Sequence, residues 1–90
     1  MINFEISTIT YGAKDNGLVI YRDEKTIGYV IANTGNCPIY INNYLLQPNS
    51  WIKTFEPGYI DKTQWRMNMQ TFDACATNNA ELTILIYSKL

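Results

Sequence analysis

The sequence predicts an all-β protein, and three observations lead to that prediction. Apolar and polar residues alternate with a period of two, the spacing of an amphipathic helix is missing, and turn-forming residues recur about every 8 to 12 positions. The 90 residues match the size of one domain. We therefore expect a single domain over residues 1–90, a small antiparallel β-sandwich or barrel, jelly-roll-like, of about eight short strands.

The N-terminal third contains three expected strands. Within residues 2–11 the apolar residues first occupy even and then odd positions, and this change of parity predicts a β-bulge near Ser7 and Thr8. After a turn, residues 18–22 (LVIYR) form a second short strand. A third strand, 27–33, is apolar on both of its faces apart from one glycine.

Two turns organise the middle of the chain. Asn42 and Asn43 stand where a tight hairpin requires positive φ at two successive positions, and asparagine tolerates that conformation better than other non-glycine residues. Pro48 and Asn49 fit the second and third positions of a type II turn. The strands expected beside these turns are 38–41 and 50–55.

The C-terminal part contributes two more strands. Residues 63–70 alternate regularly and place Trp65 on the apolar face, which predicts that it lies in the core. The strand 81–87, like 27–32, is apolar on both faces. Such a strand in an antiparallel sheet needs a second cover, which is either a loop of the same chain or another subunit.

Charge and composition exclude several classes of function. Seven basic and eight acidic side chains give a net charge of −1 without a basic cluster, so neither nucleic acid nor an anionic membrane is an expected partner. The N-terminus lacks the features of a secretory signal, and no run approaches the roughly 20 apolar residues of a membrane span. Cys37 and Cys75 could form one disulfide, but two reduced, half-buried thiols are the simpler interpretation.

The absence of histidine argues against catalysis and against a metal site. It removes the commonest general base near neutral pH, the common nucleophile pairs and the commonest zinc ligand. The carboxylates, such as Glu56 and Asp61 around a Pro-Gly turn, are interpreted as solvated turn residues. Asp15-Asn16-Gly17 lacks the further ligands of a calcium loop. We expect no enzyme activity, no catalytic residue, no metal and no cofactor.

Aromatic residues are the enriched class, at 13% of the chain with seven tyrosines. Tyrosine and tryptophan supply rigid contact area with a polar edge, which suits protein interfaces and also sugar stacking. Four of them fall in or near the central turns and are the candidate interface residues: Tyr40, Tyr44, Trp51 and Tyr59. For the last three, a place in the core remains the alternative.

Residues 33–72 resemble small all-β virion proteins of tailed bacteriophages, particularly those of Bacteroidetes hosts. The resemblance lies in the order of NTGN, IYINN, the LQPNSW turn and YIDKTQW, followed by an alternation that ends at Phe72. The chain departs from that pattern at Asn43 and Asn49, where glycine is more usual, and at Cys37-Pro38 at a strand entry. The resemblance implies a repeated structural protein of a capsid, neck, tail or fibre, and it carries over no catalytic residue.

Two functions from different classes therefore remain in view. The first is a non-enzymatic virion structural or assembly protein, made in the bacterial cytoplasm, that packs against copies of itself as a homo-oligomer or against other virion proteins. The second is a small carbohydrate-binding module that binds a glycan on exposed Tyr44, Trp51 or Tyr59.

Overall fold

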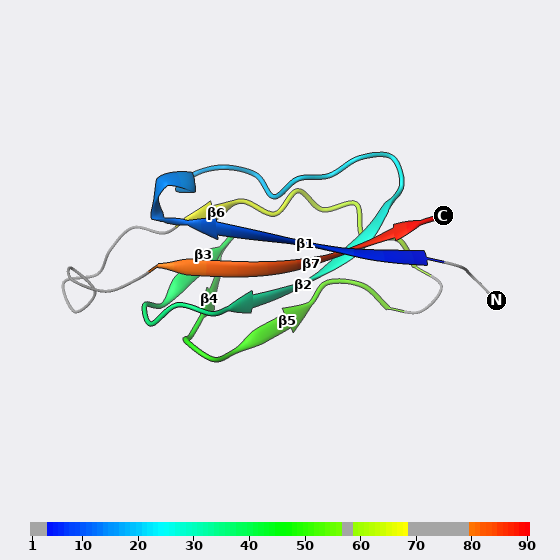
Figure 1. Cartoon of the computed structure of the whole chain (residues 1–90). Coiled ribbons are helices and arrows are strands. Elements are labelled where there is room, and N and C mark those ends of the chain that lie inside the picture. Colours follow the sequence, from blue (N-terminus) through cyan, green and yellow to red (C-terminus); the bar gives the residue numbers. More distant parts are fainter. Residues whose placement is uncertain (1–3, 57–58, 69–79) are drawn as a thin grey trace.

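The computed structural model describes residues 4–56, 59–68 and 80–90, which form two antiparallel sheets packed face to face (Figure 1). The four-stranded sheet has the order β1-β7-β2-β5, with bounds Phe4–Gly12, Glu81–Lys89, Thr26–Asn33 and Trp51–Lys53. The three-stranded sheet has the order β4-β3-β6, with bounds Tyr44–Leu46, Ile39–Ile41 and Met67–Asn68. The prediction of an all-β sandwich is confirmed.

A bridge between Val19 and Arg66 adds one more short segment beside β6. The N–H of Ile20 donates to the carbonyl of Trp65 at 2.8 Å and the N–H of Met67 donates to the carbonyl of Leu18 at 3.0 Å, and these two hydrogen bonds form the bridge. With that segment counted as the second strand, one sheet holds strands one, eight, three and six, and the other holds two, seven, four and five. This is the strand order of a jelly roll.

The core fills the space between the two sheets. Side chains alternate between the two faces of each strand, and those that point inward are mainly apolar. They contact the inward-pointing side chains of the facing sheet. Burial of each large aliphatic side chain contributes about 1.5 to 3 kcal/mol. The buried cluster consists of Ile20, Tyr29, Ile31, Ile39, Ile41, Leu46, Met67, Ala80, Leu82, Ile84 and Ile86.

The bulge predicted near Ser7 and Thr8 is wrong. β1 pairs with β7 over its whole length without a shift of register. The parity of the apolar residues changes because the two halves of β1 use different faces of the sheet. Ile9 packs against the core, whereas Ile6 belongs to the outer face and is 50% exposed. A register irregularity occurs instead in β2, between Thr26 and Gly28.

Three expected strands are clearly shorter than predicted. β5 covers three residues of the expected 50–55. Residues 18–22 pair only at Val19, and β6 covers two residues of the expected 63–70, of which 69 and 70 lie outside the described part of the chain. Trp65 packs against the core cluster but is only partly buried.

The predicted turns are largely confirmed. Asn49 has φ of 66°, and the N–H of Ser50 donates to the carbonyl of Gln47 at 3.1 Å, as in a type II turn. Asn42 has φ of 53°, but Asn43 does not share the positive φ, so the hairpin prediction was right at one of two positions. A two-residue turn needs positive φ at both positions only in the I′ form.

Asn33 at the end of β2 makes five hydrogen bonds although it is surrounded by protein, with 1% of its surface exposed. Its Nδ2 donates to the carbonyls of Cys37 at 2.7 Å and Leu46 at 2.9 Å, and its Oδ1 accepts from the N–H of Gly35 at 3.1 Å. Its backbone N–H donates to Ser50 O at 2.9 Å, and its carbonyl accepts from Asn49 N–H at 3.1 Å. The side chain thus joins β2 to the segment before β3 and to the last residue of β4.

Cys37 is buried beside this network. The second cysteine of the expected pair, Cys75, lies outside the described residues, as does Phe72.

We predict that Asn33→Ala lowers the free energy of unfolding by about 3 kcal/mol, because two buried carbonyls and one N–H lose their partner. Asn33→Asp should cost more, since a carboxylate would face the same two carbonyls without a proton to donate. Urea unfolding followed by circular dichroism measures both. Asn43→Ala, at an exposed turn position, is the control and should change the value by less than about 0.5 kcal/mol. A loss below about 1 kcal/mol for Asn33→Ala would contradict the role of this side chain.

Candidate functional site

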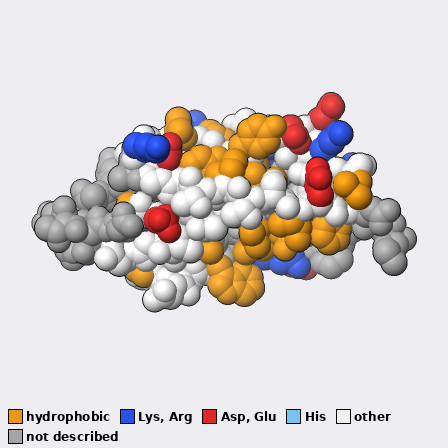
Figure 2. Space-filling model, in the orientation of Figure 1, with side chains coloured by type: hydrophobic (Ala, Val, Ile, Leu, Met, Phe, Trp, Pro, Cys, Tyr) orange, Lys and Arg blue, Asp and Glu red, His pale blue; other side chains and the backbone are white. Residues whose placement is uncertain are grey.

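The outer face of the four-stranded sheet is apolar across β2 and β7. Val30 and Ala32 of β2 and Leu85 and Tyr87 of β7 do not face the core and are hydrophobic, so the middle of both strands is apolar on two sides as the sequence indicates. Val30 lies opposite Leu85 of β7 and opposite Lys53 of β5, which aligns one row across the three strands. Figure 2 shows hydrophobic side chains gathered in a band from β5 toward the end where β1 begins and β7 ends.

An aromatic cluster occupies one end of this face. The ring of Tyr87 lies between two others, with centroid distances of 5.6 Å to Phe4 and 4.9 Å to Phe55. Lys53 Nζ is 5.1 Å from the centroid of the Phe55 ring, within the range of a cation–π contact. Each aromatic pair contributes about 0.5 to 1.5 kcal/mol beyond its buried area. The cluster therefore fixes the positions of residues from β1, β5 and β7 relative to one another.

Gly28 makes room for this cluster. A Cβ atom at that position would lie 2.5 Å from Cδ1 and 2.7 Å from Cβ of Phe55, which is closer than atoms approach without displacement. The ring of Phe55 thus packs directly on the backbone of β2, where any other residue would push it away. The single glycine in an otherwise apolar strand has a steric function.

The segment that follows β5 forms one wall of the site. Thr54 pairs with Tyr29 in both directions: its N–H donates to the Tyr29 carbonyl, and its Oγ1 accepts from the Tyr29 N–H, each at 2.9 Å. Farther along, the N–H of Asp61 donates to the carbonyl of Ile27 at 2.8 Å. These bonds attach both ends of the segment to β2 and hold Tyr59 and Ile60 beside the sheet.

Together these elements enclose a hollow of about 1040 Å³, called the sheet groove below. Its lining is mainly apolar, with three charged side chains among the hydrophobic ones. The lining residues are Phe4, Ile27, Val30, Ala32, Trp51, Lys53, Phe55, Glu56, Tyr59, Ile60, Leu85, Tyr87 and Lys89. A hollow of this size accepts a peptide segment, protruding side chains of another protein or a short glycan.

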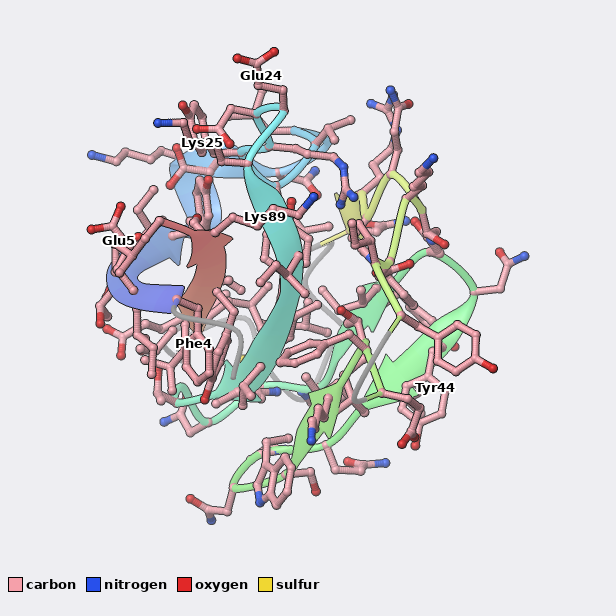
Figure 3. The ribbon with its side chains drawn as sticks, turned by 90° about the vertical axis from the view of Figure 1, so that its right-hand side faces the viewer. Phe4, Glu5, Glu24, Lys25, Tyr44 and Lys89 are labelled. Atoms are coloured by element: carbon pink, nitrogen blue, oxygen red, sulfur yellow. The ribbon has the colours of Figure 1, made fainter. Side chains whose placement is uncertain are left out.

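The four candidate interface residues are all exposed but do not form one site. Trp51 and Tyr59, 63% and 74% exposed, both line the sheet groove. Tyr40 and Tyr44, 36% and 56% exposed, belong to β3 and β4 in the other sheet. Figure 3 shows Tyr44 on the opposite side of the molecule from Phe4. For Tyr44, Trp51 and Tyr59, the alternative of a place in the core is wrong.

Sequence reasoning missed Phe4, Phe55 and Tyr87 as site residues. The available signal was the two-sided apolar character of 27–32 and 81–87, which indicated an outer face in need of cover. Phe55, Glu56, Tyr59 and Ile60 of the same chain cover part of that face, and the rest is the open groove, so cover by another subunit stays a prediction. No pattern in the sequence indicates that Phe55 packs on Gly28.

The groove offers binding surface, and its charged members Lys53, Glu56 and Lys89 lie among apolar side chains. Within residues 4–56, 59–68 and 80–90, no three His, Cys, Asp or Glu side chains come close enough to hold a metal ion. In the same part of the chain, no helix has the length and apolar character to cross a membrane.

Beside the groove, Asp61 organises the segment that leads to β6. Its Oδ2 accepts from the indole N–H of Trp65 at 2.6 Å, its Oδ1 accepts from the N–H of Thr63 at 3.1 Å, and its carbonyl accepts from Arg22 Nη2. Partial burial acts to raise the pKa of Asp61. The hydrogen bonds that its carboxylate accepts from Trp65 and Thr63 act in the opposite direction, and the pKa is lowered from 3.8.

A second hollow, of about 360 Å³, lies at the edge of the other sheet and is lined mainly by amides. Its lining residues are Val19, Asn42, Asn43, Gln64, Arg66 and Asn68. Two of them already bond to the backbone: Asn42 Oδ1 accepts from the N–H of Arg66 at 2.8 Å, and Arg66 Nη1 donates to the Gly17 carbonyl at 2.5 Å. Asn42 and Arg66 thus have a structural role, because they join the end of β3 and Gly17 to the segment before β6.

Comparisons of the chain with protein-family models, with curated proteins and with solved structures find no match.

We predict that Gly28→Ala lowers the free energy of unfolding by about 1 to 3 kcal/mol, because the new methyl group displaces the Phe55 ring. The Tyr87 ring protons, which lie next to Phe55, should change their NMR chemical shifts. Gly12→Ala is the matched control, since its Cβ would meet nothing closer than the Ala80 carbonyl at 3.9 Å. An unchanged stability and unchanged Tyr87 signals in Gly28→Ala would show that Phe55 does not lie on Gly28.

We predict that acid weakens the fold through Asp61. Because its pKa is lower in the folded chain than its ordinary value of 3.8, its contribution to stability is present above about pH 4. That contribution is lost as the pH falls through the folded-state pKa. In a Trp51→Phe background, the fluorescence of Trp65 reports the loss of the indole–carboxylate bond. Asp61→Asn should remove this acid transition, whereas Glu56→Gln should keep it; a transition that persists in Asp61→Asn would rule out this cause.

Proposed function

We propose that the protein is a non-enzymatic structural protein of a tailed-bacteriophage virion that works by packing against copies of itself or against other virion proteins. The observation that carries the proposal is the sheet groove, an aromatic and aliphatic hollow of about 1040 Å³ on a chain of 90 residues. A mainly apolar hollow lined by exposed aromatic side chains such as Trp51 and Tyr59 is typical of an interaction site. The resemblance of residues 33–72 to phage virion proteins gives the class of partner.

The construction of the groove fits protein packing. Several lining side chains are already held in place without a partner, because the Tyr87 ring contacts Phe4 and Phe55. The segment that follows β5 is also hydrogen-bonded to β2 at Thr54 and Asp61. Preformed sites lose little conformational entropy on binding. Exposed Trp51 and Tyr59 are the residue types that dominate binding energy when a partner buries them.

A carbohydrate-binding module is the second candidate, and one observation favours it. Trp51 and Tyr59 line the same hollow as Lys53 and Glu56, so aromatic faces and charged hydrogen-bonding groups lie together as a sugar ring requires. Tyr44, which the sequence also offered as a stacking residue, lies on the other sheet. A glycan would therefore contact two of the three expected residues.

The genes that flank this one provide the first test. Terminase, portal or capsid genes beside it are the expected result, and mass spectrometry of particles purified from that phage should find the chain. Genes for polysaccharide breakdown in their place would contradict the virion assignment.

We predict that Trp51→Ala weakens binding to the virion protein partner at least tenfold, since a buried tryptophan anchor contributes about 2 kcal/mol or more. The measurement is surface plasmon resonance against the separately purified head, neck and tail proteins of the same gene cluster. Tyr44→Ala changes a similarly exposed aromatic residue on the opposite sheet; it is the matched control and should bind as the wild type does. Glycan-array signals that disappear in Trp51→Ala, without binding to any virion protein, would establish the second candidate instead.

A further inference from the structure

β1 is a long edge strand with one side open. It runs from Phe4 to Gly12, pairs with β7 along its full length and is the outermost strand of its sheet (Figure 1). Residues 4–8 are all exposed. Within the part of the chain that the structure describes, no backbone hydrogen bond joins the other side of β1 to a further strand. Unpaired N–H and C=O groups of this kind are a template for pairing with another chain.

The backbone groups on the open side belong to the even-numbered residues. Gly12 N–H donates to Asp15 Oδ2 at 2.9 Å rather than to β7. In β7, the carbonyl of Glu81, which lies opposite Gly12, accepts from the backbone N–H groups of Thr34 and Gly35. The backbone N–H of Lys89 donates to the carbonyl of Lys25. Both of these β7 groups therefore point away from β1. Along an antiparallel pair, residues alternate between bonding to the partner strand and directing their N–H and C=O groups away from it. Four even residues of β1 therefore direct these groups outward: Phe4, Ile6, Thr8 and Thr10.

Two other edge strands, β5 and β4, carry features that discourage pairing, and β1 carries few. β5 and β4 are three residues long, with Lys53 on the first and Pro48 two residues after the second. β1 has nine residues, contains neither proline nor lysine nor arginine, and keeps its register without a bulge. Its single charge is Glu5, which Figure 3 shows directed away from the molecule.

We propose that β1 pairs with β1 of a second copy, antiparallel and centred on Thr8, so that two four-stranded sheets become one continuous sheet. This centre uses the whole strand and gives about six hydrogen bonds between the copies. This pairing identifies a second copy of the chain as one partner in the proposed function. Its role in an assembly rests on that proposed function. A two-fold axis through Thr8 makes the contact isologous.

The sequence of β1 is compatible with itself in this register. Thr8 meets Thr8 of the second copy, and Ile6 meets Thr10, so β-branched side chains face one another, a favourable cross-strand combination. Glu5 meets Tyr11, which keeps the two Glu5 carboxylates apart. Residues opposite each other point to the same face, so the two sheet grooves open on the same side of the continuous sheet.

The central position gives a charge-swap experiment. Thr8 is exposed, so Thr8→Lys and Thr8→Glu should both fold, but each would place two like charges directly opposite one another. Sedimentation velocity from about 10 μM to about 1 mM should show a dimer for the wild type, a monomer for each variant alone, and a dimer for their equimolar mixture. Circular dichroism confirms folding of each variant.

Hydrogen exchange gives a second readout that does not depend on a variant. The amides of Ile6, Thr8 and Thr10 should gain at least about tenfold protection from low to high protein concentration, because only the second copy bonds them. The amides of Ser7, Ile9 and Tyr11 point to β7 and should be protected at both concentrations.

Several results would overturn the pairing. They are a wild type that stays monomeric at about 1 mM, a Thr8→Lys variant that remains a dimer, or equal exchange of the even and odd amides at both concentrations. A dimer abolished by Trp51→Ala but kept in Thr8→Lys would mean that copies meet through the sheet groove; that overturns the edge pairing and leaves the proposed function intact. Absence of the chain from purified phage particles, with the charge swap confirmed, would reject the proposed function alone.

Discussion

The buried amide of Asn33 is the interaction on which the arrangement of the two sheets depends. β2 belongs to the four-stranded sheet, β3 and β4 to the other, and β5 to the first again, so the chain crosses the sandwich twice within about twenty residues. Asn33 bonds to the carbonyls of Cys37 and Leu46 at the two crossings, and to the backbone of Asn49 and Ser50 where the chain returns. It therefore fixes where β5 meets β2, and with it the position of Trp51 at the groove.

The groove follows from the small size of the chain. A domain of about this length buries only about 60 to 65% of its unfolded surface, so a sheet that is apolar on both sides cannot be covered on both by its own residues. The facing sheet covers the inner side, and Phe55 covers one end of the outer side by packing on Gly28. The aromatic rings that remain stabilise the fold and at the same time form the exposed lining. Stability and binding surface thus share the same side chains, including Tyr87 and Phe4.

Local rules predicted the turns and the class of fold, and long-range contacts determined the rest. Pro48 and Asn49 reverse the chain by their own backbone preferences, so the sequence was sufficient there. Asn33 was indistinguishable from a turn residue, because its partners Cys37 and Leu46 become neighbours only after the chain has crossed between the sheets. In β1 the apolar parity was visible, but its meaning required knowledge of the outer face to which Ile6 belongs. The cluster around Gly28 required the position of Phe55, which no periodicity encodes.

The edge of β1 and the groove meet at Phe4, whose backbone belongs to the edge and whose side chain lines the groove, but they face different directions, and the proposed assembly uses both. Edge pairing lengthens the sheet within its own plane, so it leaves the apolar outer face as open as before and places two grooves on one side. A partner that fills the groove approaches at right angles to that plane and leaves the β1 edge free. A chain with both contacts can join a copy and a different protein at the same time, as a repeated structural component must. A sugar-binding module requires the groove alone, and the unblocked edge of β1 would then be a liability without a use.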